Sequence, residues 1–179
     1  MSDYDALYKV ILVGDPGTGI SDLFRKIIPW VQEEYKMTIG ADFLSKVIQN
    51  YPCSDTTVKL QIWDIGGQDR YKFLRSSFFD GANGALIVFD LSRWHTFEEL
   101  EDWVSDLHEY AGEKVPFILI GNKVDLINKK DELYERESAE VFAKKENTYY
   151  IETSAKTGEE VEEAFLSLTQ RMLKNVSYK

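Results

Sequence analysis

Three short runs of consecutive apolar residues, at 10–13, 85–89 and 115–120, most constrain how this chain folds. Such runs are typical of strands buried on both faces, as in a parallel sheet covered by helices on each side. Segments with helical character flank these runs, at 21–28, 97–110, 131–145 and 159–173. We therefore expect a doubly wound α/β domain whose ligand-binding loops lie at the carboxyl ends of the strands.

The segment 58–62 has a different pattern, because Val58, Leu60 and Ile62 alternate with polar residues. Alternation of this kind predicts a strand with one more exposed face. The segment 43–49 is its expected partner across a turn at 51–55, which predicts a hairpin at the edge of the sheet.

The spacing of Thr157 and Glu160 matches a capping box, in which two side chains satisfy backbone N–H groups at the start of a helix. We expect this box at the start of the last helix.

Composition narrows the class of protein. A length of 179 residues with 44% hydrophobic residues predicts one domain, 1–179, with a full core. The net charge of −10 opposes unassisted binding to nucleic acid or to an anionic membrane. Cys53 is the only cysteine, and the chain has no signal peptide pattern and no apolar stretch of membrane-spanning length. We expect a cytoplasmic protein.

A glycine-rich segment lies directly between the first apolar run and the first predicted helix. It fits the phosphate-binding pattern Gly-x-x-x-x-Gly-Lys-Ser at every fixed position except that of the lysine, and reads Gly14-Asp15-Pro16-Gly17-Thr18-Gly19-Ile20-Ser21. Such a loop surrounds phosphates with backbone N–H groups, and the lysine adds a charge for the outer phosphates. Ile20 therefore keeps the cradle and removes the charge. The alternative is a glycine turn that only joins strand to helix.

A second segment, 62–68, ends a predicted strand with Asp64 followed by two glycines. Asp64 has the chemistry to hold Mg²⁺, usually through water, and Gly67 has an N–H group for a terminal phosphate. Taken alone, Asp64 fits equally well as a turn or cap residue.

Two further segments have the chemistry of a purine site. Asp125, in the segment 121–125, has a carboxylate that can accept two hydrogen bonds from the guanine edge, which adenine does not offer. The stem of Lys123 has the length to pack along the base. The backbone of the segment 152–156 is a candidate partner for the guanine oxygen. The alternatives are an Asn/Asp turn and a helix cap.

These four segments occur in order, each at a predicted strand end on the same edge of the sheet, and together they resemble the Ras superfamily of small GTPases. Within it, the segments 35–43 (YKMTIGADF) and 58–64 (VKLQIWD) are most similar to the Rab family. The resemblance extends from Tyr8 to Leu173. It implies a single P-loop domain with a six-stranded, mostly parallel sheet, one antiparallel edge strand and about five helices.

The resemblance also implies a GTP/GDP site with Mg²⁺. Ser21 and Thr38 would bind the metal, with Asp64 in its outer shell, and Gln68 would orient the attacking water. The nucleotide itself would contact Gly14 to Ser21, Thr38 and Gly67, and its base would contact Asn122, Lys123, Asp125, Ser154, Ala155 and Lys156.

Two switch segments and several partners follow from the same resemblance. Switch I would contain Thr38 and switch II would span 67–80, so that both respond to the γ-phosphate. Phe43, Trp63 and Phe78 match an aromatic trio that Rab proteins present to effectors, although aromatics in such places are often simply core. An exchange factor and a GTPase-activating protein are further expected partners, and we expect a monomer that functions in vesicle trafficking.

Several residues depart from the Rab pattern. Ile65 and Gly66 replace the usual Thr-Ala pair, and Pro16 removes one backbone N–H from the loop. Val31 stands where a phenylalanine usually covers the base, and Trp30 beside it is a candidate substitute. The chain has no C-terminal cysteine, so we expect no lipid anchor and membrane association only through partners or a missing tail.

The leading hypothesis is a Rab-like switch that binds GTP and GDP and hydrolyses GTP slowly, with Lys36 as a minor candidate for a replacement charge. Losing the lysine would weaken nucleotide binding by about 10- to 100-fold, because a charge-assisted hydrogen bond contributes roughly 1.5 to 3 kcal/mol. Ile20 and Pro16 also motivate an alternative, a pseudo-GTPase that acts as an interaction module. A kinase or ATPase that uses ATP is disfavoured, because Asp125 suits guanine.

Overall fold

A computed structural model describes residues 4–27, 41–49, 55–65, 73–128 and 133–176. Its single sheet has six strands in the order β2-β3-β1-β4-β5-β6. Their bounds are β1 Ala6–Gly14, β2 Ala41–Gln49, β3 Thr57–Ile65, β4 Gly84–Asp90, β5 Phe117–Asn122 and β6 Tyr149–Thr153. β2 pairs antiparallel with β3, and every other pairing is parallel. The expected architecture, with one antiparallel edge strand, is confirmed.

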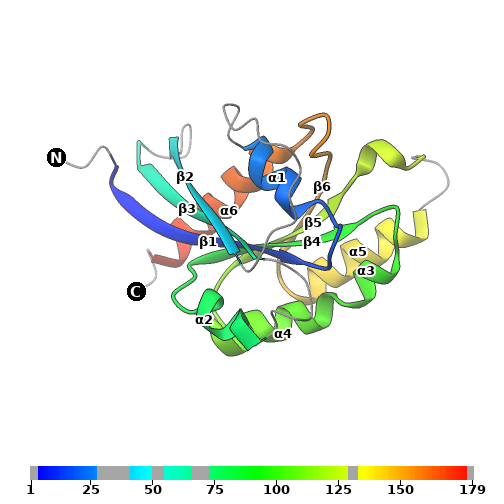
Figure 1. The fold of residues 1–179 in the computed structure, drawn as a ribbon, viewed down its shortest axis with the longest axis horizontal. Coiled ribbons are helices and arrows are strands. Elements are labelled where there is room, and N and C mark those ends of the chain that lie inside the picture. The colour runs from blue at the N-terminus through cyan, green and yellow to red at the C-terminus, as the bar shows by residue number, and fades with distance from the viewer. Residues whose placement is uncertain (1–3, 28–40, 50–54, 66–72, 129–132, 177–179) are drawn as a thin grey trace.

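Helices cover both faces of this sheet (Figure 1). They are α1 Ile20–Lys26, α2 Arg75–Phe79, α3 His95–Glu98, α4 Leu100–Tyr110, α5 Leu133–Lys145 and α6 Val161–Val176, and a 3-10 helix, η2, spans Val124–Leu126. Only Glu99 separates α3 from α4, so the described α-helices form five helical regions, in agreement with the number expected.

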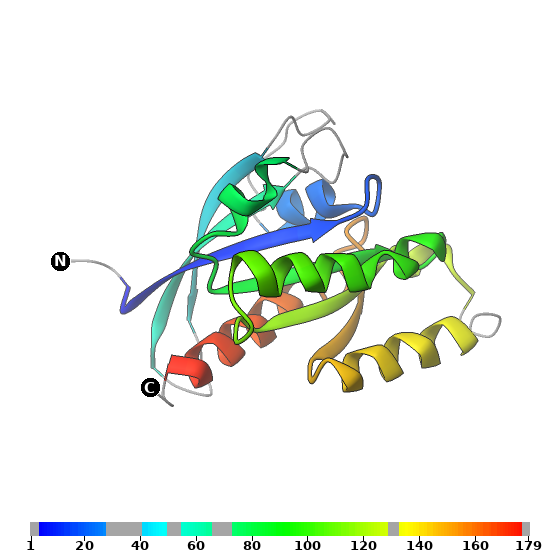
Figure 2. The same ribbon diagram turned by 90° about the horizontal axis from the view of Figure 1, so that it is seen from below.

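The sheet divides the core in two. Leu23 and Phe24 of α1 and Phe165 of α6 pack on one face, against β-strand residues such as Leu12. The other face is covered by α2, α4 and α5, whose buried residues include Phe79, Trp103 and Phe142. The turned view in Figure 2 shows α4 and α5 lying along this second face. β4 and β5, between the two cores, are buried at every position, as their apolar runs predicted.

The prediction of a capping box at the start of α6 is wrong. The hydroxyl of Thr157 accepts a hydrogen bond from the N–H of Glu159, and Glu160 has a left-handed backbone with a φ of 55°. The α-helix therefore begins only at Val161. A glutamate in this conformation cannot serve as the third helical residue of a box, since helical residues have negative φ.

We predict that Phe165→Ala lowers the free energy of unfolding by about 3 to 5 kcal/mol, because it removes a fully buried ring beneath the sheet. Urea denaturation of the two proteins measures the difference. Lys174→Ala, at an exposed position of the same helix, is the control and should change stability by less than about 0.5 kcal/mol. Equal effects of the two substitutions would contradict this description of the core.

Candidate functional site

The candidate site lies where neighbouring strands end on the same edge of the sheet. Asp90 at the end of β4 pairs in register with Asn122 at the end of β5, and Asn122 pairs with Thr153 at the end of β6. The loop from Gly14 to Gly19 follows the adjacent β1 and leads into α1. Three side chains and one glycine-rich loop are thereby brought together from distant parts of the sequence.

Asn122 is the central connection between these segments. Its amide nitrogen donates to the carbonyl oxygen of Thr18 at 2.9 Å, and its amide oxygen accepts from the Thr153 hydroxyl at 3.0 Å and from the Ala155 N–H at 3.2 Å. The side chain is almost completely buried, so these bonds replace those that it would make with water. One amide therefore fixes the loop against the ends of β5 and β6.

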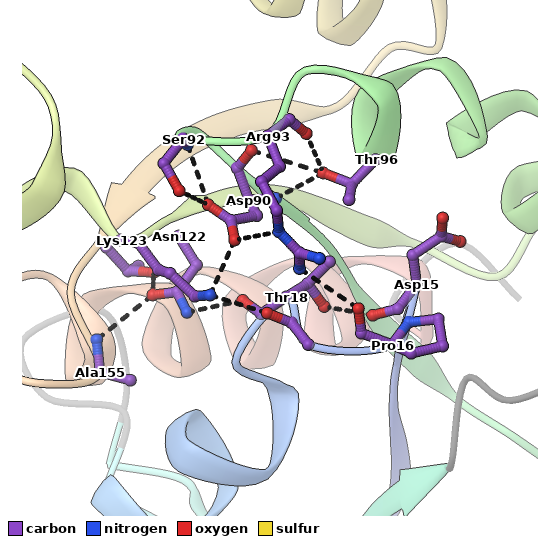
Figure 3. Close-up of polar contacts among 12 residues, drawn as sticks. Asp15, Pro16, Thr18, Asp90, Ser92, Arg93, Thr96, Asn122, Lys123 and Ala155 are labelled. Carbon is purple, nitrogen blue, oxygen red and sulfur yellow. Dashed lines mark hydrogen bonds and ion pairs between the residues drawn. The ribbon is translucent and has the colours of Figure 1, made fainter.

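Four consecutive carbonyl groups of the loop accept hydrogen bonds. The Asp15 carbonyl accepts from the Thr18 hydroxyl at 2.8 Å, and the Pro16 carbonyl accepts from Arg93 at 3.2 Å. The Gly17 carbonyl accepts from Lys123 at 2.7 Å, and the Thr18 carbonyl accepts from Asn122 as described above. Figure 3 shows these contacts grouped around the loop. The carbonyl oxygens are thus held by side chains rather than left to face a bound anion.

The N–H groups of the same loop are less engaged. Within the described part of the chain, those of Gly17, Gly19 and Ile20 have no acceptor. Backbone N–H groups in successive residues form a concave anion site when they point to a common centre. This is the chemistry that a phosphate-binding loop requires.

Glycine is required at position 19 for two reasons. Its φ of 92° lies in the left-handed region, and a Cβ atom there would collide with the Asn122 amide nitrogen. The close approach of Asn122 to the loop therefore depends on the missing side chain.

Asp90 is a completely buried carboxylate that binds both cations of the site. Lys123 lies 2.7 Å and Arg93 lies 2.9 Å from its Oδ2 atom, and Ser92 donates to Oδ1 from its N–H at 2.9 Å and its hydroxyl at 2.6 Å. Burial alone would raise the pKa of this carboxyl group, but the hydrogen bonds from Lys123, Ser92 and Arg93 outweigh it and lower the pKa below its ordinary value. Asp90 is therefore ionised near neutral pH and orients Lys123.

The candidate metal-binding groups also meet. The Ser21 hydroxyl at the start of α1 donates to Oδ2 of Asp64 in β3 at 2.6 Å. A hydroxyl and a carboxylate are hard oxygen groups of the kind that Mg²⁺ binds directly or through water. These two residues therefore fit the metal chemistry expected of them.

The candidate base-binding segments are adjacent as well. The Ser154 hydroxyl donates to Oδ1 of Asp125 at 2.6 Å, which orients that carboxylate. The Ala155 N–H is engaged by Asn122, whereas the Lys156 N–H has no acceptor among the described residues. The predicted base-binding residues thus form one contiguous group beside the loop: Asn122, Lys123, Asp125, Ser154, Ala155 and Lys156.

Ile20 occupies the position of the missing lysine and is 7% exposed. It packs in the core cluster that contains α1 and α6, and its Cδ1 atom lies 3.3 Å from the place where a Cβ of Gly14 would be. The side chain therefore fills space at the base of the loop with hydrocarbon and adds no charge.

The aromatic trio forms one cluster. Phe43 stacks on Trp63 with ring centroids 5.2 Å apart, and Trp63 lies 6.4 Å from Phe78. Phe43 is 58% exposed. The two half-buried rings of Trp63 and Phe78 thus continue into an exposed ring, which a purely core role does not explain.

Some predicted residues lie outside the described part of the chain: Thr38, Gly67 and Gln68, together with Trp30, Val31, Lys36 and Gly66. Their roles stay predictions.

Sequence reasoning missed four side chains that shape the loop. Arg93 binds a loop carbonyl and is itself held by Asp90. Thr96 accepts a hydrogen bond from the Asp90 N–H and donates to the Arg93 carbonyl at 2.8 Å, and Trp103 donates to the Asp15 carboxylate at 3.1 Å. One signal was available for Asp90, since a carboxylate directly follows the apolar run 85–89.

Comparison with known proteins identifies the family. The family model described as "Ras family" matches residues 9–174. The chain belongs to this family. It is 39% identical over 178 residues to Ras-related protein RABA1i of Arabidopsis thaliana, a match that covers 99% of this chain and 79% of that protein. It is 38% identical to Ras-related protein Rab-1 of Theileria annulata, over 99% of this chain and 79% of that protein.

A human relative, Ras-related protein Rab-30, is 36% identical over 97% of this chain and 83% of its own length. The chain is therefore a Rab-like small GTPase of the Ras superfamily, as its sequence motifs predicted. Among the described residues of this Rab-like protein, no helix is both long and apolar enough to cross a bilayer.

We predict that Asp90→Asn lowers the free energy of unfolding at pH 7 by about 1 to 3 kcal/mol, because Lys123 and Arg93 lose their charged partner. Since the pKa of Asp90 is lower in the folded than in the unfolded chain, its contribution is present above the unfolded pKa of about 3.9 and is lost as the pH falls through the folded value. The difference between wild type and Asp90→Asn should therefore shrink below about pH 4.

Urea denaturation at several pH values between 3 and 7 measures this difference, roughly across the range in which a carboxylate titrates. A difference that stays constant over that range would show that ionisation of Asp90 contributes nothing to stability.

Proposed function

We propose that this Rab-like protein binds GDP and GTP in the loop site and hydrolyses GTP slowly, switching between two states. The observation that carries the proposal is the loop itself, in which four consecutive carbonyls are tied to side chains while three N–H groups have no described acceptor. A preformed anion cradle needs little rearrangement to receive phosphates.

Selectivity for guanine is assigned to the segments beside the loop. The Asp125 carboxylate, oriented by Ser154, would accept hydrogen bonds from the N1–H and amino groups of guanine. Adenine presents no such pair of donors. The Lys156 N–H is an available donor for the guanine oxygen, and the Lys123 stem would cover the base.

Ser21 and Asp64 would hold Mg²⁺, with Thr38 as a further ligand by family resemblance. When bound, the metal would neutralise charge on the phosphate oxygens. Gln68 is the proposed residue that orients the attacking water. Support comes from the 2.6 Å hydrogen bond between the Ser21 hydroxyl and the Asp64 carboxylate, which places two hard oxygen groups together at the start of α1.

Ile20 would affect catalysis more than occupancy. Binding depends on many loop N–H groups, and the loss of one cation among them weakens it by about 10- to 100-fold. Hydrolysis depends on groups that stabilise the transition state more than the ground state, and a lysine at the outer phosphates is one of these. We therefore propose that intrinsic hydrolysis is slow and that an activating protein accelerates it.

The proposed partners are effectors that bind the exposed end of the aromatic cluster of Phe43, Trp63 and Phe78, as well as an exchange factor and an activating protein. Support comes from the stacking of these rings and the exposure of Phe43. Relatives named Rab suggest that the pathway is vesicle trafficking, on membranes reached through partners.

Purified protein should contain or bind guanine nucleotide. We expect chromatography of the nucleotide released by denaturation to show GDP or GTP, and nucleotide-free protein to bind GDP in a Mg²⁺-dependent titration with no comparable binding of ADP. Protein that is both empty and unable to bind GDP would refute the proposed function and indicate an interaction module instead.

Ile20→Lys tests the role of the missing charge. We predict that it increases GDP affinity by about 10- to 100-fold and raises the rate of single-turnover GTP hydrolysis. It should also lower the stability of the nucleotide-free protein by about 1 to 2 kcal/mol, because Ile20 packs in the core.

Ile20→Met is the matched control, since it supplies a long unbranched side chain without charge. It should leave GDP affinity within about twofold of wild type, a difference well below that expected for a charge-assisted hydrogen bond. Equal gains from lysine and methionine would attribute the effect to side-chain shape and contradict a role for charge.

A further inference from the structure

Arg93 lies against the outer side of the loop that lacks its lysine. It follows β4 in the turn before α3, 77 residues away from Pro16 in the sequence. One terminal nitrogen donates to the Pro16 carbonyl at 3.2 Å, and Nε lies 2.9 Å from the Asp90 carboxylate. Figure 3 shows the guanidinium group between these two partners. It is therefore fixed at both ends of its planar group.

The same guanidinium group covers Gly17. A Cβ atom built on Gly17 would lie 3.0 Å from one terminal nitrogen of Arg93 and 3.5 Å from the other. Gly17 has one of the loop N–H groups without a described acceptor. A phosphate bound to that N–H would lie within roughly one Debye length, about 8 Å, of the guanidinium charge.

The cluster of Asp90, Lys123 and Arg93 has a net positive charge. Asp90 and Lys123 alone would form a neutral pair. Arg93 adds a second cation to the same carboxylate, which leaves one net positive charge within this three-residue cluster. An arginine has five N–H donors, and only two of those in Arg93 have partners among the described residues. The group retains both charge and hydrogen-bonding capacity.

We propose that Arg93 supplies, from outside the loop, part of the positive charge that Ile20 does not supply from within it. The charge of Arg93 thereby strengthens the binding of the diphosphate and triphosphate groups more than that of the nucleoside. This inference rests on the proposed binding of guanine nucleotides. Lys123 binds the neighbouring Gly17 carbonyl, but its side chain is assigned to the base.

The arrangement also explains how the loop accommodates Pro16. Proline has no N–H to offer to a phosphate, so residue 16 contributes only its carbonyl. Arg93 binds that carbonyl, which turns a position without a donor into an anchor for a cation. The loop thus loses one N–H group but gains an attachment point for a charge.

The test compares Arg93→Gln, Arg93→Lys and wild type in competition titrations with a fluorescent GDP analogue, using guanosine, GMP and GDP as competitors. We expect Arg93→Gln to weaken GDP binding by about 3- to 10-fold and guanosine binding by less than about twofold, with GMP between them. Arg93→Lys should recover part of the loss. The effect should decrease as salt is added, because a half-exposed charge is screened.

Two controls separate charge at the phosphates from other causes. Lys145→Gln removes one positive charge from an exposed site near the start of β6, whereas the loop site lies where the strands end. This substitution should leave all three affinities unchanged. In an Ile20→Lys background, Arg93→Gln should have a smaller effect on GDP binding, since both cations would act on the same phosphates. A purely structural role of Arg93 predicts the same loss in both backgrounds and for all three ligands.

The possible failures are distinguishable. Wild-type protein that binds no guanine nucleotide would overturn the proposed function and, with it, the role of Arg93. Wild-type protein that binds GDP with the same affinity as Arg93→Gln, or an equal loss for guanosine and GDP, would overturn only the role of Arg93.

Discussion

The loop between β1 and α1 has its shape because side chains from other strand ends hold its carbonyl groups. Asn122, Lys123 and Arg93 each bind a different carbonyl, and Asp90 in turn holds the two cations. Without these contacts, a glycine-rich segment with three positive φ angles would have many accessible conformations. The shape of the loop is thus a property of the whole sheet edge, and the loop sequence alone does not determine it.

This dependence explains why the altered loop is compatible with the rest of the protein. A lysine at position 20 would have served the ligand, whereas the bonds that shape the loop come from β4, β5 and the segments that follow them. Ile20 can therefore pack in the core while the backbone around it keeps its hydrogen bonds. The hydrogen-bonded shape of the loop and the positive charge that faces the phosphates are separate features of this fold, and Ile20 alters only the second.

Sequence reasoning predicted those parts of the molecule that depend on local pattern. The apolar runs identified β1, β4 and β5, and the alternation at 58–62 identified the edge hairpin. β6 has no such signal, because its residues are mostly half-exposed and begin with an exposed tyrosine. The capping box failed because its spacing fits the sequence while the backbone at Glu160 turns left-handed, which no spacing rule detects. The roles of Arg93 and Trp103 depend on contacts across 77 and 88 residues, so only the folded structure reveals them.

One indole links the loop to α2, the short helix that lies within the predicted switch II segment 67–80. Trp103 of α4 donates to the Asp15 carboxylate, and the guanidinium group of Arg75 from α2 lies 3.7 Å from the centre of its ring. Arg75 is also paired with Asp106, one turn further along α4. α2 and the phosphate loop therefore share a single rigid, buried side chain, so a displacement of either one changes the surroundings of the same ring. Trp103 is thus an intrinsic fluorophore whose environment depends on both segments at once.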